Sequence, residues 1–167
     1  MTEQGYETIK IEKEDGIAWL IMNRPEKRNA MNPQMHYEMD RALPEIEADP
    51  EVRAVVLTGA GEAYCAGQDL KEYFRGLDDD PAERRRASEA SERWRNRRLA
   101  TFNKPTIAMV NGYCIGGGFT QTLSCDFALA AEEAIFCLSE VNWGILPGGL
   151  VSKKLVEAVR FRDAMLY

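Results

Sequence analysis

The sequence has few of the residues that metal sites and nucleophilic triads need. It contains one histidine, His36, in 167 residues, so a histidine-based triad depends on that residue and a multi-histidine metal site is excluded. Its four cysteines are far apart and lack C-x-x-C spacing, at Cys65, Cys114, Cys125 and Cys137. This pattern predicts reduced, mostly packed thiols and no metal site.

The chain also lacks a long apolar run and an excess of positive charge. No window approaches the roughly 18 to 20 apolar residues of a membrane span, and the start MTEQGYETIK has no secretory-signal pattern. The net charge of −6 argues against nucleic acid and acidic membrane surfaces as partners. We therefore expect a cytoplasmic protein that binds neither nucleic acid nor membranes.

What is present is typical of one folded domain. Apolar residues make up 45% and charged residues 29% of the chain, which are values of globular proteins. A chain of this length can bury one ordinary core. Residues 1–167 are therefore interpreted as a single domain.

The apolar pattern predicts an α/β fold. Residues 9–22 read as a hairpin with its turn at Asp15-Gly16. A helix is expected after the cap Asn32, and Pro44 is expected to kink it or end it early. The runs VRAVVLTGAG, TIAMV and CDFALAA are followed by glycine turns or helical segments, which favours β-β-α units with buried parallel strands.

An arginine-rich segment, AERRRASEASERWRNRRLATF, predicts a helix. Its simplest interpretation is a solvated face supported by a Glu89–Arg93 pair at i,i+4. A phosphate-binding role is a weaker alternative, and RNA association is weaker still.

Two glycine turns could carry chemistry. GYCIGGGFT and CAGQDLKEYF each follow a strand and precede a helical segment. Backbone N–H groups exposed at two strand ends can stabilise an oxygen that gains negative charge. A tight turn that packs a helix closely is the structural alternative for the glycines.

Four blocks of the sequence resemble one enzyme superfamily. NRPEKRNAMNP, LTGAGEAYCAGQDLKEYF, KPTIAMVNGYCIGGGF and CDFALAAEEAIFCLSEVNWGILPGG occur in the order found in the crotonase (enoyl-CoA hydratase/isomerase) superfamily. DLKEYF and LSEVNWGILPGG are most similar to the hydroxycinnamoyl-CoA (feruloyl-CoA) hydratase-lyases. The resemblance runs from about Thr8 to Tyr167, and it implies a crotonase-like spiral of β-β-α units.

The resemblance also implies an oxyanion hole and a site for the substrate thioester. The backbone N–H groups of Gln68 and Gly117 are expected to bind the thioester carbonyl. The family usually has a small or apolar residue where Gln68 stands, so the pocket is expected to differ in shape. Ala66 lies where the family contacts the adenine of coenzyme A, and Leu70 is expected along the acyl pocket.

Further positions carry open alternatives. Lys27 and Arg28 are expected near the coenzyme A phosphates, with an ordinary solvated turn as the alternative. Tyr73 matches the tyrosine that approaches the phenolic oxygen of the substrate in this subfamily; alternatively it covers the core. Thr120 stands where typical hydratases have a second glutamate, and either orients water or satisfies the backbone of a helix.

Glu140 is a lone acid in the apolar stretch FCLSEVNWGILPGGL. A strand-end glutamate facing water is one interpretation. The resemblance instead implies the catalytic carboxylate of the subfamily, because an apolar pocket disfavours its charged form and suits it to pass protons in both directions.

The implied reaction is hydration and retro-aldol cleavage of 4-hydroxycinnamoyl-CoA or feruloyl-CoA to 4-hydroxybenzaldehyde or vanillin and acetyl-CoA. Coenzyme A is part of the substrate, and no separate cofactor is expected. Family members continue into C-terminal helices, so we expect a core that lacks this region and whose full-length form is a homotrimer or a dimer of trimers. Another crotonase-type enoyl-CoA hydratase or isomerase, and a non-catalytic acyl-CoA-binding or oligomer-interaction module, are the alternatives.

Overall fold

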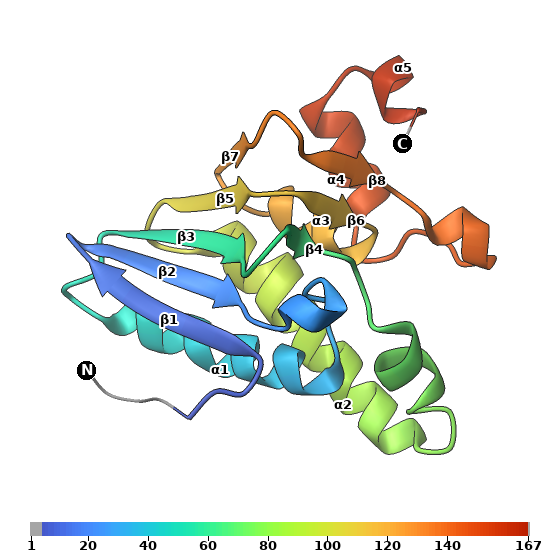
Figure 1. Ribbon diagram of the computed structural model, residues 1–167, viewed down its shortest axis with the longest axis horizontal. Coiled ribbons are helices and arrows are strands. Elements are labelled where there is room, and N and C mark those ends of the chain that lie inside the picture. Colours follow the sequence, from blue (N-terminus) through green and yellow to red (C-terminus); the bar gives the residue numbers. More distant parts are fainter. Residues whose placement is uncertain (1–4, 167) are drawn as a thin grey trace.

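The chain forms two β-sheets with helices packed beside them (Figure 1). The computed structural model describes residues 5–166. The larger sheet has the strand order β1-β2-β3-β5-β7, and the smaller has the order β4-β6-β8. The strands are β1 Ile9–Glu14, β2 Ile17–Met22, β3 Ala54–Gly59, β4 Ala63–Cys65, β5 Thr106–Val110, β6 Tyr113–Ile115, β7 Phe127–Ala130 and β8 Ile135–Cys137.

The first two strands form the predicted hairpin and pair antiparallel over their whole length. The turn residues Asp15 and Gly16 both have positive φ, 52° and 81°. Two such residues form a type I′ turn, whose twist matches that of the strands it joins. Ala18, Leu20 and Met22 alternate with less buried residues along β2, so one face of the hairpin faces the core.

The other paired strands run parallel, and the chain alternates between the two sheets. β2, β3, β5 and β7 are parallel neighbours in the larger sheet, and β4, β6 and β8 are parallel in the smaller. Each consecutive pair, β3–β4, β5–β6 and β7–β8, therefore places one strand in each sheet. This confirms the predicted α/β arrangement of β-β-α units, and it brings the carboxyl ends of β4, β6 and β8 to one edge.

The helices lie after these strand pairs. The α-helices are α1 Pro33–Ala48, α2 Pro81–Glu92, α3 Gly117–Thr122, α4 Val151–Ala158 and α5 Phe161–Ala164. The 3₁₀ and π-helical turns are η1 Pro25–Lys27, η2 Leu70–Arg75, η3 Arg93–Arg98, η4 Leu99–Thr101 and η5 Glu140–Trp143. Of these turns, η2 and η3 are π-helical.

Helix α1 begins as predicted but does not stop at its internal proline. The side chain of Asn32 accepts a hydrogen bond from the backbone N–H of Met35 at 3.0 Å, as a cap does. Of the two alternatives at Pro44, the early end is wrong, because α1 continues past it, and the kink stays a prediction. Leu43 and Ile46 are buried in the core on either side of the proline, so tertiary packing holds the helix where local propensity would end it.

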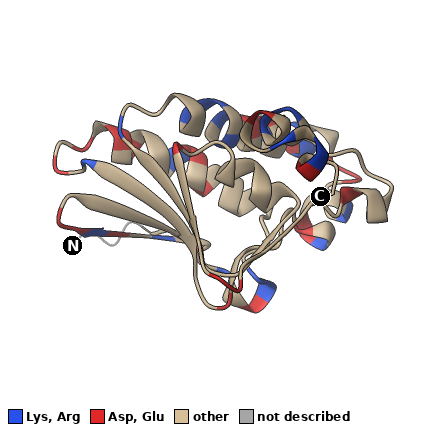
Figure 2. Cartoon of the chain, turned by 90° about the horizontal axis from the view of Figure 1, so that it is seen from above, with Lys and Arg blue, Asp and Glu red and all other residues tan. Residues whose placement is uncertain are grey.

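The arginine-rich segment forms α2, η3 and η4, and Figure 2 shows both signs of charge mixed on this helical side. The predicted support between Glu89 and Arg93 is electrostatic and involves no direct ion pair: Arg93 contributes to lowering the pKa of Glu89, after the larger effect of Arg85. Glu89 instead pairs with Arg85 at 2.9 Å, and Arg93 pairs with Asp40 of α1 at 2.7 Å. Nε and a terminal nitrogen of Arg93 both donate to Asp40, so a contact between two helices takes the place of one along α2.

The cysteines are free thiols, as predicted. Burial raises the pKa of Cys65 to about 11 and that of Cys114 to about 12, so both stay protonated at neutral pH. Within residues 5–166, no helix combines the length and the apolar composition that a membrane crossing requires.

Candidate active site

The two predicted glycine turns lie against each other at the ends of β4 and β6. These strands are parallel neighbours, with Cys65 opposite Cys114. A methyl group on Gly67 would lie 3.4 Å from the backbone nitrogen of Gly117, and one on Gly118 would lie 2.6 Å from the carbonyl oxygen of Cys65. The glycines therefore permit a backbone approach that a side chain would prevent.

Each turn presents an amide that the fold leaves unused. The backbone N–H of Met31 donates to the carbonyl of Gly67 at 2.8 Å, and the carbonyl of Met31 accepts from the N–H of Asp69 at 2.9 Å. Because successive peptide groups of an extended segment point to opposite sides, the N–H of Gln68 points away from Met31. Among residues 5–166, no group accepts a hydrogen bond from the backbone N–H of Gln68 or Gly117.

Glu140 lies beside this pair of turns. It opens η5, directly after β8, and its Oε1 lies 3.1 Å from the point that a methyl group on Gly116 would occupy. Gly116 has a φ of 51°, so the backbone there also favours glycine. Oε2 of Glu140 is buried and has no hydrogen-bond partner among the described residues, although buried polar atoms normally have one. An unpartnered carboxylate oxygen next to two unused amides is an arrangement that a ligand would complete.

A cavity of about 280 Å³ joins these groups. It is lined by Gln68, Tyr73, Phe74, Ser88, Ser91, Glu92, Arg95, Asn96, Gly117, Thr120, Glu140, Ile145, Leu146, Gly148 and Gly149. All five residues predicted to be catalytic are among them: Gln68, Tyr73, Gly117, Thr120 and Glu140. The structure therefore gathers residues from four separated parts of the chain around one space.

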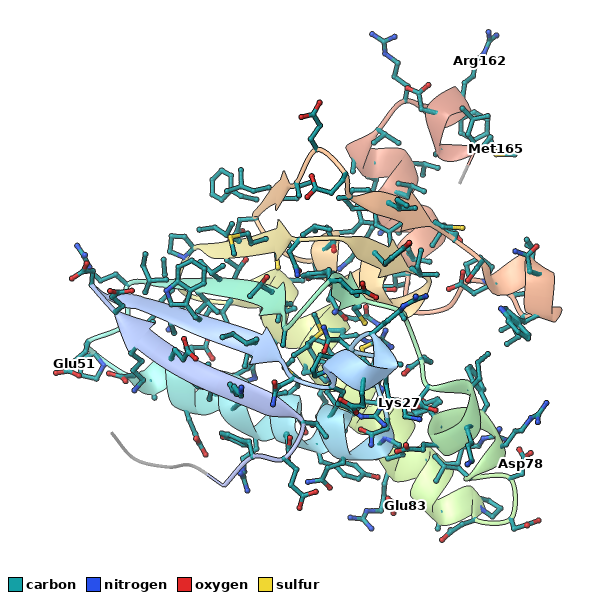
Figure 3. All side chains as sticks on the ribbon, viewed as in Figure 1. Lys27, Glu51, Asp78, Glu83, Arg162 and Met165 are labelled. Atoms are coloured by element: carbon teal, nitrogen blue, oxygen red, sulfur yellow. The ribbon has the colours of Figure 1, made fainter. Side chains whose placement is uncertain are left out.

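The four residues predicted to bind substrate do not line this cavity. Leu70 is 40% exposed. Ala66 donates its backbone N–H to the carbonyl of Arg28 at 2.9 Å, and the Arg28 side chain lies 3.4 Å from Glu62. Lys27 is exposed on η1 (Figure 3). The roles of these residues at coenzyme A stay predictions.

Thr120 and Tyr73 both line the cavity. Thr120 is buried in α3, and its hydroxyl bonds to no other described residue, so the alternative of a backbone-satisfying hydroxyl has no support. The ring of Tyr73 meets His36 edge-on, with 5.4 Å between ring centroids. Both side chains remain able to face a ligand.

His36 belongs to a buried hydrogen-bonded chain. The indole Nε1–H of Trp94 donates to His36 Nδ1 at 3.0 Å, and an indole nitrogen can only donate. Burial, as the main cause, lowers the pKa of His36 from 6.5 to about 3, so the ring is neutral. Its proton is therefore on Nε2, which donates to Oε1 of Gln68 at 2.8 Å and fixes the Gln68 side chain.

The pH dependence of unfolding should report this buried histidine. The unfolded state binds a proton on His36 below about pH 6.5, whereas the folded state does not until about pH 3. The free energy of unfolding should therefore fall as the pH drops from 6.5 to 4.5, by at most about 1.4 kcal/mol per pH unit. In His36→Gln this slope should flatten, as measured by urea unfolding at several pH values. Equal slopes in both proteins would contradict a neutral, buried His36.

Five cavity residues were missed by sequence reasoning because they lie in the segment interpreted as a solvated face: Ser88, Ser91, Glu92, Arg95 and Asn96. The sequence did contain a signal for an inward-facing side of this helix. Ala87, Ala90, Ser91 and Trp94 are all buried, and their small or aromatic side chains recur at helical spacing, which places Arg95 on the inner face. Glu92 is a second cavity carboxylate, and it accepts a hydrogen bond from Asn96.

Two further residues fix the loops around the site. Arg24, which is buried, donates to Asp69 at 3.1 Å and to Glu72 at 2.8 Å. The Asn29 side chain donates to the carbonyls of Ala60 and Ala63 at 2.9 and 2.7 Å. The turn that carries Gln68 is therefore braced by the segment after β2.

Comparison with known proteins identifies the family and the fold. The pattern of the enoyl-CoA hydratase/isomerase family matches residues 12–166. Over 167 residues the chain is 52% identical to the hydroxycinnamoyl-CoA hydratase-lyase of Pseudomonas fluorescens. A Legionella pneumophila structure described as a crotonase-type enoyl-CoA hydratase/isomerase superposes with a TM-score of 0.84 at 33% identity. An enoyl-CoA hydratase from Bacillus anthracis superposes with a TM-score of 0.86 at 29% identity.

These matches cover nearly all of this chain but only part of each relative. The Pseudomonas fluorescens protein is matched over 99% of this chain and 60% of its own length. The match to the Legionella pneumophila structure covers 95% of this chain and 61% of that structure's chain. The match to the Bacillus anthracis structure covers 96% of this chain and 61% of that structure's chain. The chain thus spans about 60% of the length of these relatives, and over that span it has the predicted crotonase-like fold.

Proposed function

Because the chain belongs to the enoyl-CoA hydratase/isomerase family, we propose that the protein hydrates the side-chain double bond of 4-hydroxycinnamoyl-CoA or feruloyl-CoA and cleaves the product to an aromatic aldehyde and acetyl-CoA. One observation carries the proposal: a carboxylate oxygen without a partner, on Glu140, beside the unused amides of Gln68 and Gly117.

The two amides bind the thioester oxygen. Both the addition of water and the later cleavage pass through an enolate, whose negative charge is on that oxygen. Donors that are already in place stabilise this charge without having to reorganise, which is worth about 3–4 kcal/mol for a single such donor. One pair of amides thus serves both halves of the reaction.

In the first half Glu140 acts as a base and then as an acid. It takes a proton from water while the water oxygen bonds to the β-carbon, and the electrons of the double bond move to the thioester oxygen. The proton held by Glu140 then adds to the α-carbon, giving the β-hydroxy thioester. The unpartnered Oε2 is suited to this work, since no protein hydrogen bond has to break first.

In the second half Glu140 removes the proton of the β-hydroxyl group. The C–O bond becomes a carbonyl, the bond between the α- and β-carbons breaks, and its electron pair forms the acetyl-CoA enolate. Protonation of the α-carbon by Glu140 completes acetyl-CoA and restores the carboxylate. Atoms and charges balance without any further reactant.

The ring end of the substrate would lie toward Tyr73. A phenol hydroxyl can donate or accept a hydrogen bond, which fits a phenolic oxygen on the ring. The Tyr73 ring is held edge-on by His36 and by Phe74, each with 5.4 Å between centroids. Release of electrons from a para-oxygen stabilises the aldehyde that forms, which is why aromatic substrates are favoured over fatty ones.

Hydration without cleavage is a second candidate, favoured by Glu92. This carboxylate also lines the cavity, and two carboxylates could share the proton transfers of simple hydration. It is however engaged by Asn96 and lies 3.9 Å from Arg97. These contacts occupy Glu92, whereas Oε2 of Glu140 has no hydrogen-bond partner among the described residues.

Product analysis separates the two candidates. The protein is mixed with 4-coumaroyl-CoA or feruloyl-CoA, and the products are resolved by chromatography. We expect 4-hydroxybenzaldehyde or vanillin in equal amount to acetyl-CoA. A β-hydroxy thioester that accumulates without aldehyde would support hydration alone, and thioester binding without any turnover would leave only the non-catalytic acyl-CoA-binding alternative.

A further inference from the structure

Two arginines are buried in this protein, and they differ in their partners. Arg24 is 8% exposed and pairs with both Asp69 and Glu72. Arg95 is 7% exposed, yet no carboxylate among residues 5–166 lies within ion-pair distance of it. Buried charges are normally paired, since an uncompensated one is strongly destabilising. The positive charge of Arg95 is therefore left without an anionic partner among the described residues.

The contacts of Arg95 are all with neutral groups. One terminal nitrogen donates to the carbonyl of Gly117 at 3.3 Å, and the other donates to the hydroxyl of Ser91. Nε is buried and has no hydrogen-bond partner among the described residues. Burial also lowers the pKa of Arg95, because a charged guanidinium is less stable away from water. The guanidinium thus lies in the cavity wall between Gly117 and Ser91, which also line the cavity.

Gln68 adds a second donor at the same place. Its Oε1 is occupied by His36, so the amide Nε2 is the end left to donate, and no described residue accepts from it. Both side chains lie close to Gly117. A methyl group added to Gly117 would be 3.1 Å from a terminal nitrogen of Arg95 and 3.6 Å from the Cγ of Gln68. The side chains converge on the cavity wall, and both offer only donors there.

We infer that Arg95 selects the substrate of this site by binding the ring oxygen of the hydroxycinnamoyl group as a phenolate, with the Gln68 amide as a further donor. The inference rests on the proposed function and deepens it, because it names the ionised form of the substrate. A phenolate supplies the missing negative charge. It also releases electrons into the ring more strongly than a phenol does, which assists the cleavage step.

Other titratable groups face Arg95 and take part in the same electrostatic balance. They come from η2, α1, β4, α2 and η5 and are Tyr73, His36, Cys65, Glu92 and Glu140. His36 is neutral, and the Cys65 thiol stays protonated well above neutral pH. Both carboxylates oppose a bound phenolate. In Glu140→Gln protein only Glu92 does so, and the pKa shift of the bound phenol is there the net effect of Arg95 against Glu92.

The ionisation of a bound substrate can be observed directly. A conjugated phenol absorbs at longer wavelength when it loses its proton. 4-Coumaroyl-CoA is bound to Glu140→Gln protein, which should not turn it over, and the absorbance is followed from pH 6 to pH 10. We expect the pKa of the bound phenol to lie about one to three units below that of the free thioester. An unshifted or raised pKa would overturn the inference.

Variants assign the shift to Arg95. In the same Glu140→Gln background, Arg95→Met should abolish the shift and Arg95→Lys, which keeps the charge, should retain part of it. Arg85→Met is the matched control, since Arg85 is exposed and pairs only with Glu89; it should retain the full shift. Binding of 4-methoxycinnamoyl-CoA, which cannot ionise, should not weaken in Arg95→Met. A shift that persists in Arg95→Met would overturn the role of this residue.

The outcomes also separate this inference from the proposed function. If Glu140→Gln protein fails to bind 4-coumaroyl-CoA, or still cleaves it, the proposed function fails. If it binds the thioester without cleaving it and the phenol keeps its ordinary pKa, the proposed function stands and only the phenolate is refuted.

Discussion

Glu140→Gln should lower the rate of aldehyde formation from feruloyl-CoA by about 10³-fold, the middle of the range for loss of a general acid–base group. Gln has nearly the same shape as Glu but cannot take the proton of water or of the β-hydroxyl group. Binding of the thioester should change little, because the amides of Gln68 and Gly117 belong to the backbone. Steady-state assays should show the loss in kcat, with KM within a fewfold of its original value.

The same substitution should leave the protein at least as stable. Oε2 of Glu140 is buried without a partner, so Gln, which has nearly the same shape, breaks no protein hydrogen bond there. Thermal unfolding should therefore occur at an equal or higher temperature in Glu140→Gln. Glu92→Gln is the control within the cavity and should keep activity within about tenfold, a small part of the general acid–base effect. Full turnover by Glu140→Gln would refute the proposed role of this residue.

Much of the fold could be predicted because its signals are local. The hairpin follows from one turn, Asp15-Gly16, whose residues accept positive φ. Helix α1 begins where Asn32 can cap it. The alternation of apolar strands with glycine turns gives the β-β-α units. In each case a few neighbouring residues carry the information, and the structure confirms them.

The errors occur where tertiary packing overrides local preference. Pro44 cannot donate a backbone hydrogen bond, yet the core contacts of α1 extend on both sides of it. Arg93 pairs across to Asp40 and not along its own helix. Arg95 follows the buried Ala87, Ser91 and Trp94 on the inner face of its helix. The many charged residues of this segment favoured a solvated face instead.

The candidate site was predictable only in part. The glycine turns indicated exposed amides, but the roles of Gln68, Gly117 and Glu140 came from the resemblance to a family. The structure then brought these residues to one cavity. It did not bring Leu70 there, and it added the chain from Trp94 through His36 to Gln68. Contacts between residues so far apart in sequence have no local signature.

Gly118→Ala should disrupt the site through the backbone, with no catalytic side chain removed. The added methyl group would lie 2.6 Å from the carbonyl oxygen of Cys65 and 2.9 Å from its Cβ, distances at which atoms must move apart. Gly118 is helical without positive φ, so the substitution introduces no backbone strain of its own. The start of α3 and the end of β4 should separate, and with them the amides of Gly117 and Gln68.

The expected loss in kcat/KM for Gly118→Ala is about 10²-fold, since a displacement of about 1 Å at a reacting group can have that effect. Overpacking should also lower the free energy of unfolding by about 1–3 kcal/mol, measured by denaturant titration. Gly148→Ala is the matched control: Gly148 lines the same cavity, but a methyl group there meets nothing within 4 Å. If Gly118→Ala retained the activity of Gly148→Ala, the close approach of the two turns would not be what positions the amides.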